Sequence, residues 1–421
     1  MKYFFPDSQD TVDPSFDFEK ETRSIERVRH RDDQYAHEVF SEPAFDGLLV
    51  SKGIVDGYGN TGSRYTLAQR HRLYREGVRS FFRVDNRNLS IMGDCGAFTY
   101  VREPEPPYTV EQVIDFYVEC GFDHGISVDH VIFNYQPKWD TAGFFEDVEA
   151  ADARRRQEIT LSLAAEFMAY HRKHKLAFEP MGAAQGWSPR SYAHSVLELQ
   201  KIGYEYIALG GMVALKTKDI LACLRAMSEI RHPKTRLHLL GVTRTDHLED
   251  FANLGVWSFD STSPLRQAFK DDKDNYYSPE RTYTAIRIPQ VNANPALMKR
   301  ISSGQVSQDQ AKKLERLALE AIKQYDSGAW ELEKALDALV EYDNFCDPRK
   351  DMREIYREVL TEQPWKHCGC DVCCKLGYHV ILFRGAERNR RRGFHNVWVF
   401  YRRVQDRIDR LAAKQADSVG R

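Results

Sequence analysis

The sequence lacks any long hydrophobic run. No apolar stretch approaches the roughly 18–20 residues that a membrane-spanning helix needs. The first ten residues, MKYFFPDSQD, contain too short an apolar stretch before Pro6 and Asp7 to form a signal peptide. We therefore expect a cytoplasmic protein that has no membrane partner.

Cysteine is also scarce, with only eight among 421 residues, and the lack of a secretion signal argues against disulfides. Three cysteines nevertheless form the motif Cys368-x-Cys370-x-x-Cys373, and His395 follows 22 positions later. Three thiolates and one imidazole make up the closed tetrahedral set that structural zinc prefers, with Cys374 as a surplus thiol. The motif predicts a zinc ion that stabilises the fold and does not take part in chemistry.

Net charge is almost absent, at −2, but the charges are unevenly distributed. Residues 366–421 contain 13 Lys and Arg against 5 Asp and Glu, whereas the other 365 residues contain 47 against 57. Trp398, Phe400 and Tyr401 lie among these basic residues, an arrangement typical of nucleic-acid surfaces. A merely solvated basic face is the alternative. We expect a nucleic-acid-binding surface that includes Arg390, Arg391 and Arg392.

No internal repeat is present, yet short apolar runs that end in polar or glycine residues alternate with helical stretches. Helix starts are indicated at Thr109, with Gln112 three residues on, and at Ser188, with Pro189 after it. This alternation predicts an α/β fold, an eight-stranded β/α (TIM) barrel, with the eighth strand at Arg281–Pro289. The seven other predicted strands are Gly47–Ser51, Leu89–Asp94, Gly125–Asp129, Leu176–Met181, Tyr206–Gly210, Arg236–Gly241 and Val256–Asp260.

The rhythm of strands and helices breaks near residue 300. Ser307–Tyr325 and Ala329–Tyr342 are two amphipathic segments separated at Gly328. We expect three regions: a catalytic barrel with an N-terminal extension over 1–300, a helical insertion over 301–345, and a zinc-binding, basic subdomain over 346–421.

Polar residues at the carboxyl ends of barrel strands face the active site. Asp94, Asp129, Gln185, Gly210–Gly211 and Asp260 occupy such positions. One aspartate after a strand is often only a helix cap. Three carboxylates at one mouth indicate a site in which at least one carboxyl shares a proton or binds a polar ligand.

These residues also resemble motifs of a known family, the tRNA-guanine transglycosylases. Met92-Gly-Asp94-Cys-Gly-Ala-Phe98 is similar to the family's Asp-Ser-Gly-Gly-Phe-Gln signature, and Gly182-Ala-Ala-Gln185-Gly186 is similar to its Val-Gln-Gly-Gly loop. Ala208-Leu-Gly210-Gly211 matches its glycine pair, and Gly255-Val-Trp-Ser-Phe-Asp260-Ser-x-x-Pro-x-Arg266 resembles its nucleophile region. The Cys-x-Cys-x-x-Cys and His set belongs to the family as well.

Several positions depart from the family pattern. Cys95 stands where the signature has serine, Thr99 replaces its glutamine, and Ser127-Val-Asp-His130 replaces Asp-Glu-Cys. The insertion after residue 300 and the stretch from Asp7 to Pro14 also lie outside the pattern. These features are more similar to the DNA-modifying branch, which exchanges guanine in DNA for a 7-deazaguanine precursor.

The resemblance implies a role for each residue. Asp260 is the expected nucleophile and Asp94 the general acid/base, as in a retaining glycosidase. Asp129, Gln185, Gly210, Gly211 and Phe98 are expected to bind the base, and Arg266 to join the arginines that bind nucleic acid. Structural zinc is the implied cofactor. A free 7-deazaguanine base (7-cyano-7-deazaguanine), an ATPase partner and a homodimer are also implied.

Two alternatives remain open at this point. The same reaction on tRNA differs only in the polymer. A non-catalytic nucleic-acid-binding subunit would have no chemical need for both Asp94 and Asp260. A barrel hydrolase with a catalytic metal is disfavoured, because no His-x-His pair ends an early strand.

Overall fold

The computed structural model describes residues 1–58, 62–144, 147–270 and 273–419. The chain divides into two compact units. The barrel unit comprises residues 1–9, 45–262 and 404–421, and the helical unit comprises residues 10–44 and 263–403. The helix α16 (Gly385–Val419) contributes to both units.

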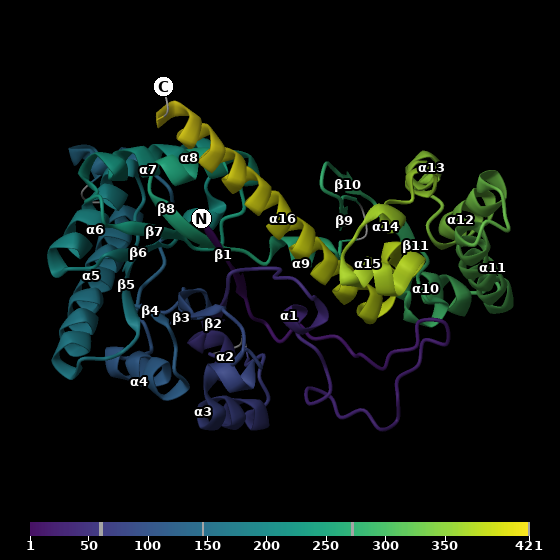
Figure 1. Cartoon of the computed structure of the whole chain (residues 1–421), viewed down its shortest axis with the longest axis horizontal. Helices are drawn as coiled ribbons and strands as arrows, with labels where there is room; N and C mark the ends of the chain where they lie inside the picture. The colour runs from purple at the N-terminus through teal and green to yellow at the C-terminus, as the bar shows by residue number, and fades with distance from the viewer. Residues whose placement is uncertain (59–61, 145–146, 271–272, 420–421) are drawn as a thin grey trace. The chain divides into compact units, whose positions relative to one another are not determined.

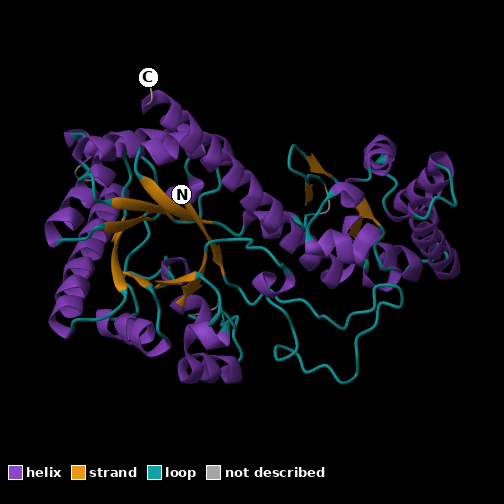
Figure 2. Ribbon diagram, viewed as in Figure 1, coloured by secondary structure: helices purple, strands orange, loops and turns teal. Residues whose placement is uncertain are grey.

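Eight parallel strands close into a barrel in chain order, which confirms the predicted fold (Figure 2). All seven runs predicted from residue 47 onward coincide with or overlap a barrel strand. The strands are β1 (Lys2–Pro6), β2 (Gly47–Ser51), β3 (Ser90–Asp94), β4 (His124–Ile126), β5 (Glu179–Ala184), β6 (Tyr206–Leu209), β7 (Arg236–Leu239) and β8 (Val256–Asp260).

The eighth strand was predicted at the wrong place. Closure comes from β1, which pairs with β2 on one side and with β8 on the other, so that Phe4 lies opposite Gly47 and Asp260. Its three aromatic side chains, Tyr3, Phe4 and Phe5, are buried, and this burial drives the segment into the barrel. Residues 281–289 instead form β10 (Thr282–Tyr283) and β11 (Ile286–Arg287) in the helical unit.

Helices follow most of the barrel strands (Figure 1). The predicted caps are confirmed: the Thr109 side chain accepts from the Gln112 N–H, and Ser188 caps a helix that begins at Pro189. These helices are α2 (Lys52–Asp56), α3 (Leu67–Phe81), α4 (Val110–Cys120), α5 (Val148–His174), α6 (Pro189–Ile202), α7 (Thr217–Ile230) and α8 (Leu248–Asn253).

Side chains from successive strands pack together in the interior of the barrel. A buried layer from successive strands includes Phe4, Leu49, Met92, Ile126 and Met181. The packing also depends on small residues, because a Cβ at Gly47 would lie 2.5 Å from the Phe4 ring. The barrel therefore acts as a rigid scaffold for the residues at the carboxyl ends of its strands.

The helical unit contains the two predicted amphipathic helices. They are α11 (Gln308–Asp326) and α12 (Leu332–Cys346), which pack on each other through Ala321, Ala335 and Ala338. The remaining elements of this unit are α1 (Ala36–Val39), α9 (Ser263–Gln267), β9 (Tyr276–Tyr277), α10 (Pro295–Ser302), α13 (Arg353–Glu362), α14 (Pro364–His367), α15 (Asp371–Leu376) and β12 (Leu382–Phe383).

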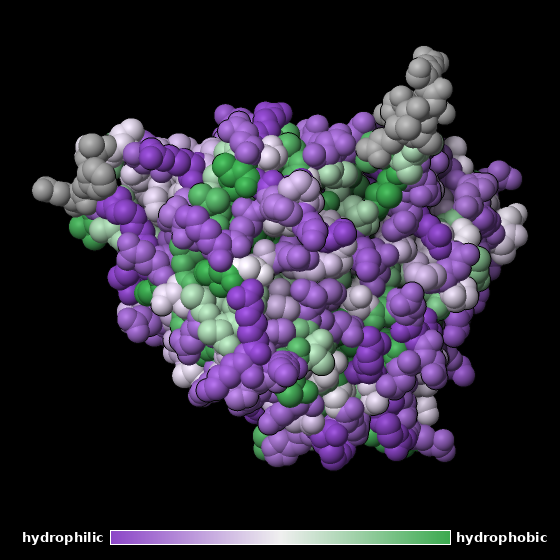
Figure 3. Space-filling view, turned by 60° about the vertical axis from the view of Figure 1, so that its left-hand side comes forward, coloured by the Kyte–Doolittle hydropathy of each residue, from purple (hydrophilic) through white to green (hydrophobic). Residues whose placement is uncertain are grey.

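Among the described residues, no helix is both long and apolar enough to cross a membrane. The face of the molecule drawn in Figure 3 is mostly hydrophilic, with hydrophobic residues in small groups.

Candidate active site

The carboxyl ends of the barrel strands bring Asp94, Asp129 and Asp260 together. Asp94 ends β3, Asp260 ends β8, and Asp129 lies three residues beyond β4. One carboxylate oxygen of Asp94, the Cys95 Sγ and one carboxylate oxygen of Asp129 all lie within 4.8 Å of one another. The predicted convergence of polar residues at one mouth is thus present.

Asp94 is the carboxyl that holds a proton. Burial, together with the negative charges of Asp129 and Asp260, raises the pKa of Asp94 from its ordinary value to about 7. A hydrogen bond of 3.1 Å from the Gly96 N–H to Asp94 Oδ2 opposes this shift only in part. Near neutral pH, Asp94 can therefore both give and take a proton.

Gly96 is required by the turn that follows Asp94. Its φ is +88°, and a Cβ would lie 2.6 Å from Ser51 Oγ and 2.7 Å from the Gly53 nitrogen. A side chain here would push apart the loops after β2 and β3. Gly96 thus allows the loop that follows Asp94 to lie close to the segment that follows β2.

Asp129 is buried and is held by three side chains. The Cys95 thiol donates to Asp129 Oδ1 over 3.1 Å, and Gln185 Nε2 donates to Oδ2 over 2.5 Å. The Tyr100 hydroxyl lies 3.1 Å from both the Cys95 Sγ and the Asp129 carbonyl oxygen. Burial raises the pKa of Asp129, and the bonds from Cys95 and Gln185 oppose that rise by favouring the carboxylate.

Gln185 is itself fixed in place by the backbone around it. Its Oε1 accepts from the Ile132 N–H over 3.2 Å, and a Cβ at Gly210 would lie 2.1 Å from its Nε2. Gly211 has a φ of +73°, and a Cβ there would lie 2.4 Å from the Ile132 carbonyl oxygen. Both glycines are therefore needed for the close approach of Gln185 and of the Ile132 backbone, and their expected role in binding the base stays a prediction.

Asp260 is buried at the end of β8 and has defined partners. The Gly241 N–H donates to Asp260 Oδ1 over 2.9 Å, and His238 Nε2 lies 3.3 Å from the same oxygen. The other ring nitrogen of His238 lies 2.7 Å from Ser258 Oγ. Because both contacts fall on Oδ1, the carboxylate is oriented with Oδ2 left for another partner.

Two aromatic side chains beside this site are exposed. Phe98 is 56% exposed and Phe133 is 38% exposed, and their ring centroids are 5.3 Å apart. They follow the segments that contain Asp94 and Asp129 in the chain. Exposed rings in such a place can stack on a planar base.

The predicted metal ligands form one buried cluster in the helical unit. The sulfurs of Cys368, Cys370 and Cys373 lie 3.6, 3.4 and 3.3 Å from His395 Nδ1. Ligands around a tetrahedral zinc ion with ordinary bond lengths are about 3.5 Å apart, so these residues fit a metal ion. His395 Nε2 lies 2.7 Å from the Tyr277 carbonyl oxygen, which fixes the ring with Nδ1 toward the sulfurs.

The basic segment differs from the prediction. Arg391 and Arg392 are buried, and Arg392 donates to the carbonyl oxygens of Leu382 and Ala268 at 2.8 and 2.7 Å. Arg391 donates to the Asp13 carbonyl oxygen over 2.7 Å. Both side chains are thus occupied by backbone acceptors and turned away from solvent, and their expected role in binding DNA stays a prediction. Arg390 is half-buried and Arg266 is exposed, and their role stays a prediction.

Sequence reasoning also missed several residues of the site. His238 lies between Leu237 and Leu239 in β7, and a histidine between two leucines is a signal from which it could have been found. Tyr100, Phe133 and the thiol of Cys95 gave no comparable signal, because their contacts depend on how neighbouring loops fold.

Comparison with known proteins adds one match. A protein named DNA-guanine transglycosylase, from Salmonella montevideo, is 50% identical over 409 residues. The match covers 96% of this chain and 97% of that protein. No protein-family model matches the chain.

Proposed function

This chain belongs to the DNA-guanine transglycosylase family, a group of pentosyltransferases, and we propose on that premise that it replaces guanine in DNA with a 7-deazaguanine. The incoming base we propose is 7-cyano-7-deazaguanine, and the route is a covalent aspartyl-glycosyl intermediate. The observation that carries this proposal is that two different carboxyl groups occur in one site. Asp94 has a pKa of about 7, and Asp260 is oriented by the Gly241 N–H.

In the first step an Asp260 oxygen attacks C1′ of the deoxyribose, and the bond from C1′ to guanine breaks. Asp94 gives its proton to the departing guanine, which takes the bonding electron pair with it. The sugar is then held as an ester on Asp260, and the backbone of the DNA is never cut.

In the second step the incoming base gives its ring N–H proton to the Asp94 carboxylate. Its nitrogen attacks C1′, and Asp260 leaves as a carboxylate. Both groups return to their starting states, so one carboxyl serves in turn as acid and base. A pKa of about 7 suits that double use.

Recognition of the base falls to Asp129 and its neighbours. An ionised Asp129 can accept from the amino and ring N–H edge of a guanine-like base, while Phe98 and Phe133 offer their rings for stacking. A base inside a duplex must first leave the stack, at a cost of about a few kcal/mol.

For the metal cluster we propose structural zinc. Three sulfurs and one imidazole nitrogen are the donor set that zinc prefers, and a closed site leaves no position for substrate. An ATPase partner, a homodimer and a cytoplasmic location, which the resemblance or the composition suggested, stay predictions.

The choice of polymer is tested with radiolabelled guanine. The purified protein is incubated separately with plasmid DNA and with tRNA, and label in each polymer is counted after removal of free base. We expect incorporation into plasmid. Incorporation into tRNA alone would overturn the proposal.

A further inference from the structure

The N-terminal arm of the helical unit, residues 10–44, contains a loop with an unusually exposed tip. This tip loop spans Thr22–Arg31. Within it Ile25 is fully exposed and Val28 is 45% exposed. Single exposed aliphatic side chains are common on protein surfaces, so the significance of Ile25 and Val28 depends on the charges that surround them.

The tip loop is held in a defined shape at its base. Val12 and Gln34 exchange two backbone hydrogen bonds of 2.9 Å, and Arg27 lies in ion-pair distance of both Asp13 and Asp33. Those two aspartates are buried. The exposed residues at the tip thus project from a closed and hydrogen-bonded base.

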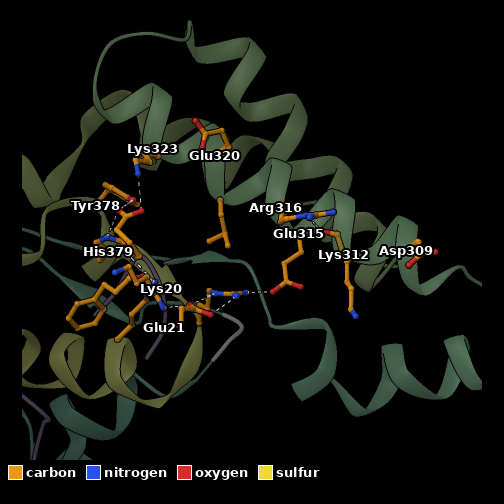
Figure 4. Close-up of a pocket in the computed structure, with 15 residues that line it drawn as sticks. Lys20, Glu21, Asp309, Lys312, Glu315, Arg316, Glu320, Lys323, Tyr378 and His379 are labelled. Carbon is orange, nitrogen blue, oxygen red and sulfur yellow. Dashed lines mark hydrogen bonds and ion pairs between the residues drawn. The ribbon is translucent and has the colours of Figure 1, made fainter. Parts of the chain in front are cut away.

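The basic segment of α16 anchors the arm. Glu21 accepts from Arg384 at 2.6 and 2.7 Å and from Arg388 at 2.5 Å, within a cavity of about 770 Å³ that also holds Lys20 and Tyr378 (Figure 4). Arg384 also lies 2.7 Å from Glu315, so two carboxylates face the two arginines. Arg384 and Arg388, which lie in the same arginine-rich stretch of the sequence as Arg390–Arg392, therefore bind an acidic residue of the arm.

The tip loop carries its own exposed cations instead. The side chains of Arg23 and Arg31 are 46% and 67% exposed, although Arg23 lies 3.1 Å from Glu387 and Arg31 lies 2.7 Å from Asp32. Arg29 is exposed and has no ion-pair partner among the described residues. Glu26 is the one acidic residue between Thr22 and Arg31. The tip is therefore cationic around an apolar side chain.

We propose that the tip loop contacts duplex DNA, with Ile25 and Val28 in a groove and the exposed arginines on the flanking phosphates. Proteins that insert isoleucine or a similar side chain between base steps combine it with arginines in this manner. Two aliphatic side chains offer too little area for a stable protein interface, which buries at least about 1,000 Å². The inference rests on the proposed function, because that function supplies DNA as the partner.

The test measures binding of the full chain to a fluorescent duplex oligonucleotide by anisotropy at several salt concentrations. Ile25→Ala removes no buried contact, so the fold should be unchanged, and we expect about a fivefold rise in Kd with the same salt slope. Arg29→Ala should raise Kd and flatten the slope of log Kd against log salt by about one.

Matched controls are available in the same unit. Ile355, 36% exposed on α13, and Arg349, whose side chain is 87% exposed, are changed to alanine in the same way. Both controls should bind within about twofold of the parent protein. If Ile25→Ala and Arg29→Ala also bind duplex as the parent does, the inference is overturned.

The proposed function is judged separately by guanine exchange into plasmid with the parent protein. A parent protein that exchanges guanine while both tip variants bind normally would contradict the inference alone. A parent protein that exchanges no guanine into DNA would contradict the proposed function, whatever the binding data show.

Discussion

Gln185 Nε2 and Asp129 Oδ2 are joined by a hydrogen bond of 2.5 Å between two buried side chains. Cys95 donates to the other oxygen of the same carboxylate. Asp129 thus receives a donor on each oxygen from the protein itself, and these two hydrogen bonds oppose the rise in its pKa that burial causes. The carboxylate proposed to bind the base is therefore held in position by the protein alone.

The first prediction concerns Tyr100, which acts on Asp129 through Cys95 and the backbone. Tyr100→Phe removes the hydroxyl 3.1 Å from both groups and should raise KM for the incoming base about tenfold with little change in kcat. Tyr58→Phe, whose ring packs edge-on against Tyr100, is the control. Equal KM values in the two variants would show that the Tyr100 hydroxyl does not position Asp129.

The second prediction concerns the nucleophile. Asp260→Asn keeps the shape of the side chain but lacks a carboxylate, so guanine exchange and the covalent adduct with DNA should both disappear. The adduct is measured by denaturing electrophoresis with labelled DNA. Asp115→Asn, an exposed change on α4, should leave both signals intact, and an adduct that persists in Asp260→Asn would show that another group attacks.

The third prediction concerns the acid. The folded protein raises the pKa of Asp94 from 3.8 to about 7, so it holds this proton more tightly than the unfolded chain does. That contribution to stability is complete below about pH 4 and is lost as the pH rises through about 7. Asp94→Asn should therefore become relatively more stable over this range, by at most about 4 kcal/mol and less because the carboxyl is partly exposed.

Thermal unfolding of the parent protein and Asp94→Asn between pH 4 and pH 8 measures this difference. Catalysis should follow the same group: kcat/KM of the parent should fall above about pH 7, where the acid has lost its proton. A stability difference that is constant with pH would contradict the raised pKa of Asp94.

The fourth prediction concerns the metal. Cys370→Ser should lower the bound zinc below one equivalent and reduce the melting temperature, because metal binding and folding are coupled. Cys374→Ser is a close control, since this neighbouring thiol is exposed and lies outside the cluster. Plasma mass spectrometry and calorimetry provide the two measurements. Full stability of the parent after complete metal removal would contradict a structural zinc.

The sequence predicted the barrel from residue 47 onward because each strand there is a compact apolar run that ends in a polar residue. The strand β1 was not predicted, because the run of Tyr3, Phe4 and Phe5 is short and its partner β8 lies some 250 residues away. Pairing between such distant segments leaves no local signal. The zinc-type cluster was predictable, since ligand spacing within a short stretch is itself the signal.

The roles of the arginines could not be predicted from composition. Arg384, Arg391 and Arg392 look like a phosphate-binding run in the sequence, yet their partners are Glu21 and backbone carbonyl groups. A count of charges cannot distinguish an arginine that faces solvent from one that satisfies buried acceptors. Only the position of the N-terminal arm settles that question.

The pairing of β1 with β8 has a consequence for synthesis on the ribosome. Lys2–Pro6 is synthesised some 250 residues before its partner Val256–Asp260. Until β8 has been made, β1 cannot pair with it. During that time the aromatic side chains of β1 can bind chaperones or take part in aggregation. Since Asp260 ends the strand that completes closure, a growing chain that has not yet reached Asp260 cannot hold the assembled candidate site.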